Sequence, residues 1–497
     1  MNKSKNAVQI NHNDNVAVVL ANISKGDSVL NTTAVVPIPA GHKIAVKHIN
    51  SGENVIKYGH PIGRATAAIQ PGTHVHVHNL KTNLSGIEKY TFTPSHMSRV
   101  RQPASQETFL GYVRPNGQIG IRNEIWIINT VGCVNKIAEK LVQEAGRRHA
   151  GKTDGIYTFV HPYGCSQLGE DHAYTQNILK NLANHPNAAG VLVLGLGCEN
   201  NHIDEFKQVL GSWDSARLKF LNTQDVSDEM TEGLSIIDKL VAYAETFNRE
   251  PVPVGKLVIG LKCGGSDGFS GITANVLVGS VSDAIISREG ACLLTEVPEM
   301  FGAETLLMNR CIDADVFAKS VSLINGFKKY FIRHNQEIYE NPSPGNKDGG
   351  ITTLEEKSLG CTQKGGVSHV TDVLNYGETV RRPGLNLLQG PGNDIVAVTN
   401  LTAAGAHIIL FTTGRGTPLG APVPTVKISS NTALAVNKPH WIDFDAGVLL
   451  SDNTCGLEAL TGQLLDYILS LASGEIYTKN EVNDYREISI FKDGVTL

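Results

Sequence analysis

Short apolar runs separated by turn residues fill about the first 90 positions of the chain. The runs are VAVVL (16–20), HKIAVKHI (42–49), NVIKYGHPIGRATAAI (54–69) and HVHVHNL (74–80). Short runs bounded by Gly, Pro and Asn are typical of β-strands, and no long helical period appears among them. The pattern predicts a small β-rich domain at 1–90. Residues 91–108 lack periodicity and mix Pro, Ser and charge, which indicates a linker.

From residue 109 onward, continuous apolar runs alternate with segments of helical spacing. EIWIINTVGC (124–133) is followed by NKIAEKLVQEAGRR (135–148), where apolar residues recur at helical intervals among charged ones. Continuous apolar strands that alternate with helices are typical of a parallel sheet covered on both faces. We therefore expect an α/β fold, with two α/β domains of mostly parallel sheets at 109–250 and 251–497.

Composition narrows the class of protein. Glycine makes up 50 of the 497 residues and aromatic residues only 6%, which favours an α/β enzyme with tight turns. The 43 basic and 48 acidic residues give a net charge of −5, whereas a nucleic-acid partner would need a basic surface. No run of about 18 apolar residues is present to span a membrane, and the N-terminus lacks the apolar segment of a secretory signal. We expect a cytoplasmic protein without nucleic-acid or membrane partners.

Cysteines follow several of the predicted strands. These are Cys133, Cys165, Cys198 and Cys263. The absence of a CxxC pair argues against common structural zinc modules and a disulfide framework. Ligands of open parallel sheets bind at the carboxyl ends of the strands, so these thiols are candidate metal ligands, with Glu199 and Asp267 beside two of them. Ordinary core packing is the alternative, because free cysteine is among the most buried residue types.

Three histidines alternate along the predicted strand at 74–80. In an extended strand His74, His76 and His78 share one face, and neighbours lie about 6.6 Å apart. Two adjacent imidazoles can then bind one metal ion, whereas three on a straight strand cannot. His42 and His60 can join them if the strands pair favourably. A polar strand face in water is the alternative.

A long polar, glycine-rich segment covers 340–366 and is expected to be a functional loop. It carries Asn346, Lys347 and, near its end, Lys364. Glycines and turn prolines around a lysine suit an anionic ligand approached by backbone N–H groups. A mobile surface loop is the alternative.

The run FTTGRGTP (411–418) places Thr412, Thr413 and Arg415 at the end of another predicted strand. An arginine between two glycines can grip a carboxylate with two hydrogen bonds. A nicotinamide or flavin cofactor is not expected, because Asn200 stands where the third glycine of a dinucleotide fingerprint would be.

Together these strings resemble the altronate dehydratase family, which is related to galactarate dehydratase. The resemblance covers essentially the whole chain, although Val276 stands where the family often has proline. The strings that carry it are GHK (41–43), HVHVHN (74–79), TVGCVN (130–135), YGCSQLG (163–169), GLGCENN (195–201), CGGSDGFSGITAN (263–275), TEVPEMFGAE (295–304), NPSPGNKDGGITTLEEKSLGCTQK (341–364) and FTTGRGTP (411–418).

The resemblance implies a hydro-lyase that converts D-altronate to 2-dehydro-3-deoxy-D-gluconate and water in galacturonate breakdown. It also implies an N-terminal domain of the SAF type and Fe²⁺, with Mn²⁺ as the alternative metal. The triple-histidine run favours altronate over galactarate. The expected partner is a small sugar acid, and a homo-oligomer is compatible with the sequence.

The expected mechanism removes the proton beside the carboxylate and expels the 3-hydroxyl, with a metal ion stabilising the developing charge. The imidazoles and the strand-end thiols are expected to meet on one cation. The candidate catalytic residues are His76, Lys347 and Asp267. The candidate substrate-binding residues are Arg415, Asn346, Thr412, Thr413 and Lys364. The candidate metal ligands are His74, His76, His78, Cys165, Cys198, Glu199 and Cys263.

Three alternatives remain open. The enzyme can prefer galactarate or another sugar acid of the same family. It can be an iron–sulfur dehydratase in which three strand-end cysteines hold a cluster, although the ligands of such clusters often lie closer together in sequence. From a different class, it can be a sugar-acid-binding regulator without turnover.

Overall fold

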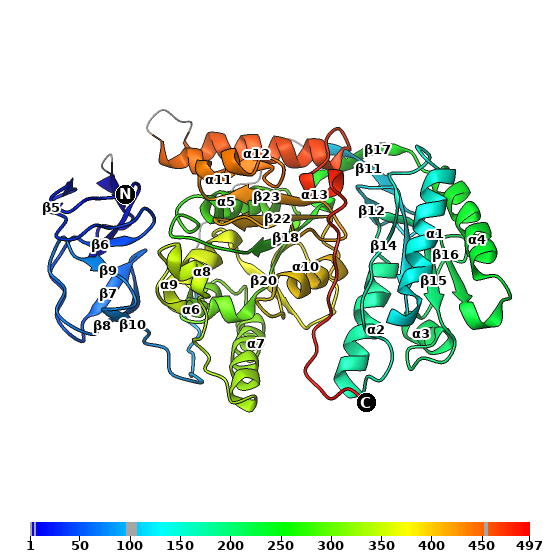
Figure 1. Ribbon diagram of the computed structural model, residues 1–497, viewed down its shortest axis with the longest axis horizontal. Coiled ribbons are helices and arrows are strands. Elements are labelled where there is room, and N and C mark those ends of the chain that lie inside the picture. Colours follow the sequence, from blue (N-terminus) through cyan, green and yellow to red (C-terminus); the bar gives the residue numbers. More distant parts are fainter. Residues whose placement is uncertain (1, 4–5, 96–106, 452–455) are drawn as a thin grey trace.

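The computed structural model describes residues 2–3, 6–95, 107–451 and 456–497. It shows three parts in a row, and their order in space differs from their order along the chain (Figure 1). The β-rich N-terminal part lies at one end, the C-terminal part in the middle and the second part at the other end. The predicted linker at 91–108 falls mostly outside the described residues. No helix in the described ranges is long and apolar enough to cross a membrane.

The N-terminal part consists of short antiparallel strands, as the sequence predicts. One sheet has the order β1-β2-β3-β6-β9, a second has the order β10-β8-β7, and β4 pairs with β5. The strands are β1 (Asn2–Lys3), β2 (Ala7–Gln9), β3 (Val16–Val19), β4 (Ser28–Val29), β5 (Thr32–Thr33), β6 (Lys43–Ala45), β7 (Asn54–Lys57), β8 (His60–Ala65), β9 (His74–Val75) and β10 (Leu80–Lys81). Alternate apolar side chains such as Ala17, Val19 and Ile44 form its core.

The histidine run departs from the predicted straight strand. Strand β9 ends at Val75, and the chain turns over the next four residues. Asn79 fixes this turn, because its side-chain oxygen accepts the His76 N–H at 3.0 Å and its side-chain amide donates to the His74 carbonyl at 3.0 Å. The prediction that His74, His76 and His78 share one extended face is therefore wrong.

The second part is built on a parallel sheet with the order β14-β13-β15-β16. A small antiparallel sheet, β12-β11-β17, connects it to the rest of the chain. Its elements are β11 (Thr108–Val113), β12 (Ile119–Gly120), β13 (Glu124–Asn129), η1 (Gly132–Val134), α1 (Asn135–Arg148), β14 (Ile156–Thr158), α2 (Gly169–Ala183), β15 (Ala188–Gly195), α3 (Ile203–Leu210), β16 (Leu218–Asn222), η2 (Thr223–Asp225), α4 (Glu229–Ala244) and β17 (Arg249–Pro253).

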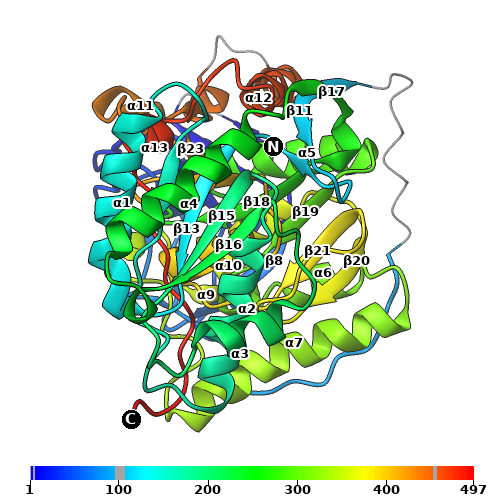
Figure 2. The same cartoon turned by 90° about the vertical axis from the view of Figure 1, so that its right-hand side faces the viewer.

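The two faces of β13 bury different partners. Ile125 and Ile127 pack in the cluster formed with α1 and α4, which lie over the outer face of the sheet (Figure 2). Trp126 and Ile128 point to the other face, where they pack with α2 and with apolar residues of the C-terminal part. Because both faces of the strand are buried, its sequence is a nearly continuous apolar run.

The C-terminal part contains a seven-stranded parallel sheet with the order β20-β21-β19-β18-β22-β23-β24. Its elements are η3 (Val254–Lys256), β18 (Val258–Cys263), α5 (Ala274–Ser287), β19 (Ala291–Leu294), η4 (Val297–Met300), α6 (Glu304–Met308), α7 (Ala314–Arg333), α8 (Pro344–Asp348), α9 (Leu354–Cys361), η5 (Thr362–Gly365), β20 (Val370–Leu374), β21 (Gly384–Leu388), α10 (Asp394–Ala403), β22 (Ile408–Thr413), β23 (Thr425–Ser429), α11 (Thr432–Asn437), β24 (Phe444–Asp445), η6 (Gly447–Leu450), α12 (Leu457–Ala472) and α13 (Lys479–Val482).

The polar segment 340–366 is largely helical, which corrects the prediction of a loop. A capping box between Ser343 and Asn346, with proline next to the cap, starts α8. The Thr353 hydroxyl accepts the backbone N–H of Glu356 and starts α9. These short polar caps outweigh the glycine content of the segment.

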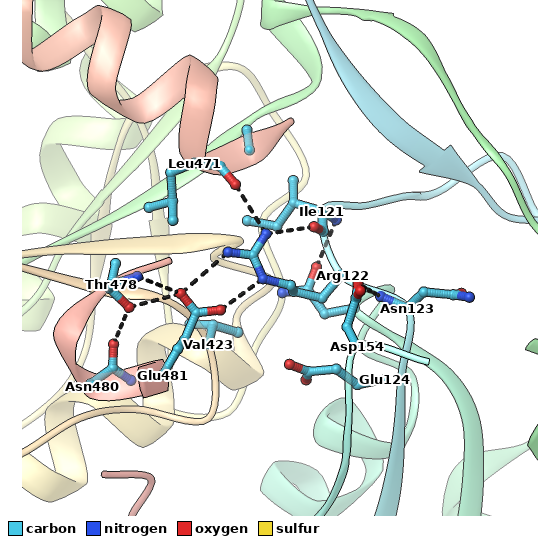
Figure 3. A network of polar contacts seen from close by, with 12 residues as sticks. Ile121, Arg122, Asn123, Glu124, Asp154, Val423, Leu471, Thr478, Asn480 and Glu481 are labelled. Atoms are coloured by element: carbon cyan, nitrogen blue, oxygen red, sulfur yellow. Dashed lines mark hydrogen bonds and ion pairs between the residues drawn. The ribbon is translucent and has the colours of Figure 1, made fainter. Parts of the chain in front are cut away.

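A buried arginine joins the second part to the C-terminal part (Figure 3). Arg122 Nε lies 2.7 Å from Glu481 Oε1, and both side chains are less than 5% exposed. The same guanidinium donates to the carbonyls of Ile121 and Leu471 at 2.8 and 3.0 Å. Its donors are therefore paired with groups from both parts, which fixes their relative position.

Candidate active site

Three imidazoles of the N-terminal part meet at the edge of its larger sheet. The antiparallel register of β6 and β9 pairs Lys43 with Val75, which places His42 opposite His76 and beside His74. One ring nitrogen from each of these three histidines lies within 4.8 Å of the others, and Nδ1 of His42 lies 3.0 Å from Nε2 of His74. We call His42, His74 and His76 the imidazole cluster.

The imidazole cluster is neutral near pH 7. Burial is the largest cause, and the neighbouring histidines and Lys43 add to it. Together they lower the pKa of His74 to about 3 and that of His76 to about 4, and burial also lowers the pKa of His42. Neutral imidazoles offer free lone pairs, and imidazole nitrogen suits iron and other transition metals. The donor set therefore fits a divalent metal ion.

The imidazole cluster lies against residues 348–352 of the C-terminal part. Nε2 of His42 lies 3.2 Å from the Asp348 carbonyl, and Nδ1 of His76 lies 3.0 Å from the Thr352 hydroxyl. Lys43, next to His42, donates to the Gly350 carbonyl and to Thr352 at 2.7 Å each. The functional segment predicted at 340–366 thus contacts the imidazoles directly.

A polar cleft of about 410 Å³ opens nearby, where β18 ends. Its lining residues are Cys263, Gly264, Gly265, Glu299, Glu340, Asn341, Ser343, Asn346, Lys357, Gly392 and Asp394. At its base the Cys263 sulfur lies 3.2 Å from the Cys361 sulfur and 3.4 Å from Glu299 Oε2. These three residues are the second group in the described residues whose ligand atoms lie close enough to share one ion.

Buried lysines surround the base of this cleft. Lys357 lies 2.9 Å from Glu299, Lys364 lies 3.4 Å from Glu296, and Lys262 forms a short ion pair with the same Glu296. Lys364 Nζ makes no hydrogen bond within the described part of the chain. Each of these ammonium groups lies against a carboxylate, so the base of the cleft is a network of paired charges.

One segment connects the cleft to the imidazole cluster. Asn346 on α8 donates to the Ser266 carbonyl at 2.8 Å and accepts from Lys357 at 3.2 Å. Two residues later, the Asp348 carbonyl meets His42. Helix α8 therefore contacts both the three neutral imidazoles and the polar cleft, which is an arrangement suited to a ligand with several polar groups.

Several predicted site residues bond to the protein itself. Asp267 is buried, and its carboxylate accepts from Ser270, Ser430 and Asn431, so it ties loops together. Burial raises its pKa. Thr412 donates to Asn275 at 2.6 Å, and the Thr413 hydroxyl accepts the Gly416 N–H at 2.9 Å.

The remaining predicted residues divide between the site and the surface. Lys347 is half-buried on α8, next to the residue that meets His42. Arg415 is exposed at the end of β22. His78 stands outside the imidazole cluster, with its ring centre 5.4 Å from that of His74, and His60 is exposed on β8. The cluster therefore contains His42 in the position predicted for His78.

The strand-end thiols do not join the imidazoles within one chain. Cys165, Cys198 and Glu199 belong to the second part of the molecule, at the end opposite the N-terminal strands (Figure 1). Glu199 accepts a hydrogen bond from Thr130 and from two backbone N–H groups of its own turn. Cys263 lies in the C-terminal part, outside the imidazole group. The expectation of one shared cation is therefore corrected.

Sequence reasoning missed much of the cleft. Glu296 and Glu299 directly follow β19, a position that the strand-end rule marks as a site. Glu296 also has a positive φ of 68°, which is uncommon for a residue with a side chain. Lys357 and Cys361 lie on α9 and are buried. In the sequence, the capping residue Thr353 was the signal for this helix.

Comparison with known proteins gives the family. Three family models match in order: the altronate/galactarate dehydratase SAF domain at 5–83, the D-galactarate dehydratase/altronate hydrolase second domain at 111–245, and the D-galactarate/altronate dehydratase C-terminal domain at 254–496. An altronate dehydratase of Bacillus subtilis (strain 168) is 52% identical over 501 residues, covering 99% of this chain and 100% of the relative. The chain belongs to the altronate/galactarate dehydratase family.

Other family members differ in their distance from this chain. An altronate dehydratase of Escherichia coli (strain K12) is 51% identical over 496 residues, covering 99% of both chains. A galactarate dehydratase (L-threo-forming) of the same organism is 30% identical over 490 residues, covering 94% of this chain and 93% of the relative.

The predicted fold class is confirmed. The N-terminal part matches the SAF domain model, and the two parts that follow contain parallel sheets.

Proposed function

We propose that the protein dehydrates D-altronate to 2-dehydro-3-deoxy-D-gluconate, a step of galacturonate catabolism. The observation that carries this proposal is the identity of 52% and 51% to two altronate dehydratases over their whole length. Identity to the galactarate dehydratase is only 30%, which favours altronate as the substrate.

The reaction sets clear chemical demands. A base must take the C2 proton, the 3-hydroxyl must leave as water with an added proton, and the resulting enol becomes the 2-ketone. Negative charge develops on the carboxylate oxygens when the proton leaves. Preorganised cationic groups lower the energy of such a state, and the base must come within hydrogen-bond reach of the proton.

The proposed cofactor is Fe²⁺, with Mn²⁺ as the alternative, held by His42, His74 and His76. This assignment rests on three neutral imidazoles whose ligand atoms lie within 4.8 Å of one another. The group of Cys263, Glu299 and Cys361 is less suited, because Lys357 already neutralises Glu299 and further lysines lie around it. When bound, such an ion would stabilise charge on substrate oxygens as a Lewis acid.

The residues of the chain would bind and orient the sugar acid. Asn341 and Asn346 line the cleft beside Lys357, whose charge is already balanced by Glu299, so these side chains provide polar contacts for the hydroxyl groups. Lys347 adds a cation on α8, beside the imidazole cluster. An acid–base role is the alternative to metal binding for His76, because a neutral imidazole whose nitrogen is not bound to a metal can accept a proton.

We place the reaction in the cytoplasm. All seven described cysteines are free thiols, and this supports a compartment that keeps thiols reduced.

The direct test is anaerobic incubation of the metal-depleted protein with D-altronate, with and without added Fe²⁺. We expect the 2-keto product only with the metal, and a much lower rate with galactarate in a parallel reaction. Binding of D-altronate without product, at every metal tested, would instead support a sugar-acid-binding regulator.

A further inference from the structure

Three exposed thiols follow neighbouring strands in the second part of the molecule, outside the proposed active site. Among the seven described cysteines, Cys133, Cys165 and Cys198 are exposed and the other four are buried. They follow β13, β14 and β15, which are neighbours in one parallel sheet. The carboxyl ends of neighbouring parallel strands meet at the same edge, about 5 Å apart.

Hydrogen bonds fasten the three thiol-bearing loops to one another. The N–H of Gly132, next to Cys133, donates to the Tyr163 carbonyl at 2.9 Å. The Gly164 carbonyl, next to Cys165, accepts the Asn201 N–H at 3.0 Å. The Ser166 N–H donates to Asn200 Oδ1 at 2.7 Å. The loops that carry Cys165 and Cys198 are therefore joined on both sides of Cys165.

A glycine precedes each of the three cysteines, and two of these glycines permit very close contact. A Cβ at Gly164, whose φ is +100°, would lie 2.0 Å from the Thr130 carbonyl oxygen. A Cβ at Gly132 would lie 2.7 Å from the His161 carbonyl oxygen. The glycines of two Gly-Cys pairs thus bring the backbones of these loops together next to the cysteines.

The surroundings add polar groups that the protein does not fully use. Gln224, after the fourth strand of the sheet, donates to the Cys198 sulfur at 3.6 Å. Asn201 Oδ1 and Gln167 Nε2 are buried in the same loops and have no hydrogen-bond partner within the described residues. Exposed thiols with nearby sulfur-directed donors differ from the buried cysteines of an ordinary core.

The geometry points to an iron–sulfur cluster held by Cys133, Cys165 and Cys198. Thiolates are the ligands that such clusters use, and soft sulfur ligands select them. A single zinc ion, about 2.3 Å from each sulfur, needs its ligands within about 4.6 Å of one another. The three thiols are not among the groups in the described residues that meet a limit of 4.8 Å. A cluster of several irons has separate attachment points for its thiolates.

Three protein ligands would leave one iron of a four-iron cluster open to an oxygen ligand of the hydroxyl or carboxylate class. The inference does not depend on the imidazole cluster, which lies at the other end of the molecule (Figure 1). It is therefore tested by spectroscopy and chemical analysis, apart from dehydratase activity.

The test is anaerobic reconstitution of the full chain with ferrous iron and sulfide, followed by removal of unbound ions. We expect broad visible charge-transfer absorption, with equal amounts of iron and acid-labile sulfide. Cys133→Ser, Cys165→Ser and Cys198→Ser should each lose most of the absorption. Cys311→Ser, which changes a buried thiol of the C-terminal part, should keep it, and so should His76→Ala.

A second measurement uses the unchanged protein and so does not depend on the folding of any variant. Reconstitution should protect the same three cysteines of the parent from alkylation. Circular dichroism of each serine variant should match that of the parent, which shows that the variant is folded. Absence of visible absorption in the parent would overturn the inference. Absorption that survives all three serine substitutions, bound zinc without sulfide, or unprotected thiols would do the same.

Discussion

Lys43 on β6 and Glu356 on α9 form a buried ion pair, with 2.8 Å between Nζ and Oε2. Lys57 on β7 binds the other oxygen of the same carboxylate, also at 2.8 Å. Burial alone would raise the pKa of Glu356, but the two ammonium groups lower it to about 2. One carboxylate of the C-terminal part thereby holds two strands of the N-terminal part and fixes the neighbouring His42.

Loss of this carboxylate should weaken the molecule. In Glu356→Gln two ammonium groups stay buried without a counter-charge, so we expect the free energy of unfolding to fall by about 3–5 kcal/mol. Urea unfolding followed by circular dichroism measures the change. Glu475→Gln, at an exposed acid, is the matched control and should change stability little. Equal stability of the two variants would contradict the role of Glu356.

The same carboxylate should make stability depend on pH. Because its pKa is about 2 in the folded state and near 4.5 in the unfolded chain, its contribution is complete above about pH 4.5. It is lost as the pH falls from about 4.5 toward 2. The difference in unfolding free energy between the parent and Glu356→Gln should therefore shrink across that window. A constant difference would show that the carboxylate does not titrate this way.

Removal of one imidazole should weaken metal binding. In His76→Ala the proposed ion loses one of its three protein ligands. Loss of a residue that only hydrogen-bonds to a metal ligand already lowers metal affinity by about tenfold or more, so we expect the Fe²⁺ affinity of this variant to fall by more than about tenfold. Equilibrium dialysis under anaerobic conditions measures it, and turnover should fall in parallel. His60→Ala, on an exposed histidine of the same domain, should retain both. Unchanged metal content and turnover in His76→Ala would remove the imidazole cluster from the mechanism.

Lys347 should act through substrate binding. Replacing it with methionine removes a charged hydrogen-bond donor, a loss of about 1.5–3 kcal/mol, so the KM for D-altronate should rise roughly tenfold or more. Steady-state kinetics measure it. The control is Lys438→Met. Lys438 directly follows α11, and its ammonium group lies over the ring of Trp441. An unchanged KM and pH profile in Lys347→Met would exclude this lysine from the site.

The sequence predicted the elements whose apolar pattern was strong. Helix α1 occupies the predicted 135–148, and the parallel sheets follow from runs such as 124–133. It predicted 340–366 poorly, because short helices with polar caps carry little apolar periodicity. Ser343 and Thr353 were the available signals.

For the site, the sequence predicted which types of residue take part better than it predicted which residues lie next to one another. His74 and His76 do meet, but the turn fixed by Asn79 and the register of β6 replaced His78 with His42. Sequence spacing cannot show which strand pairs with which. Nor can it show that the C-terminal part would separate Cys165 and Cys198 from the imidazoles.

The most direct test of the proposed activity is proton NMR of the reaction of D-altronate carried out in D₂O with the iron-loaded protein. The account predicts 2-dehydro-3-deoxy-D-gluconate that carries one deuterium at C3, because the enol left by loss of the 3-hydroxyl takes that proton from solvent. Unchanged D-altronate, or a product that keeps its 3-hydroxyl, would contradict the account.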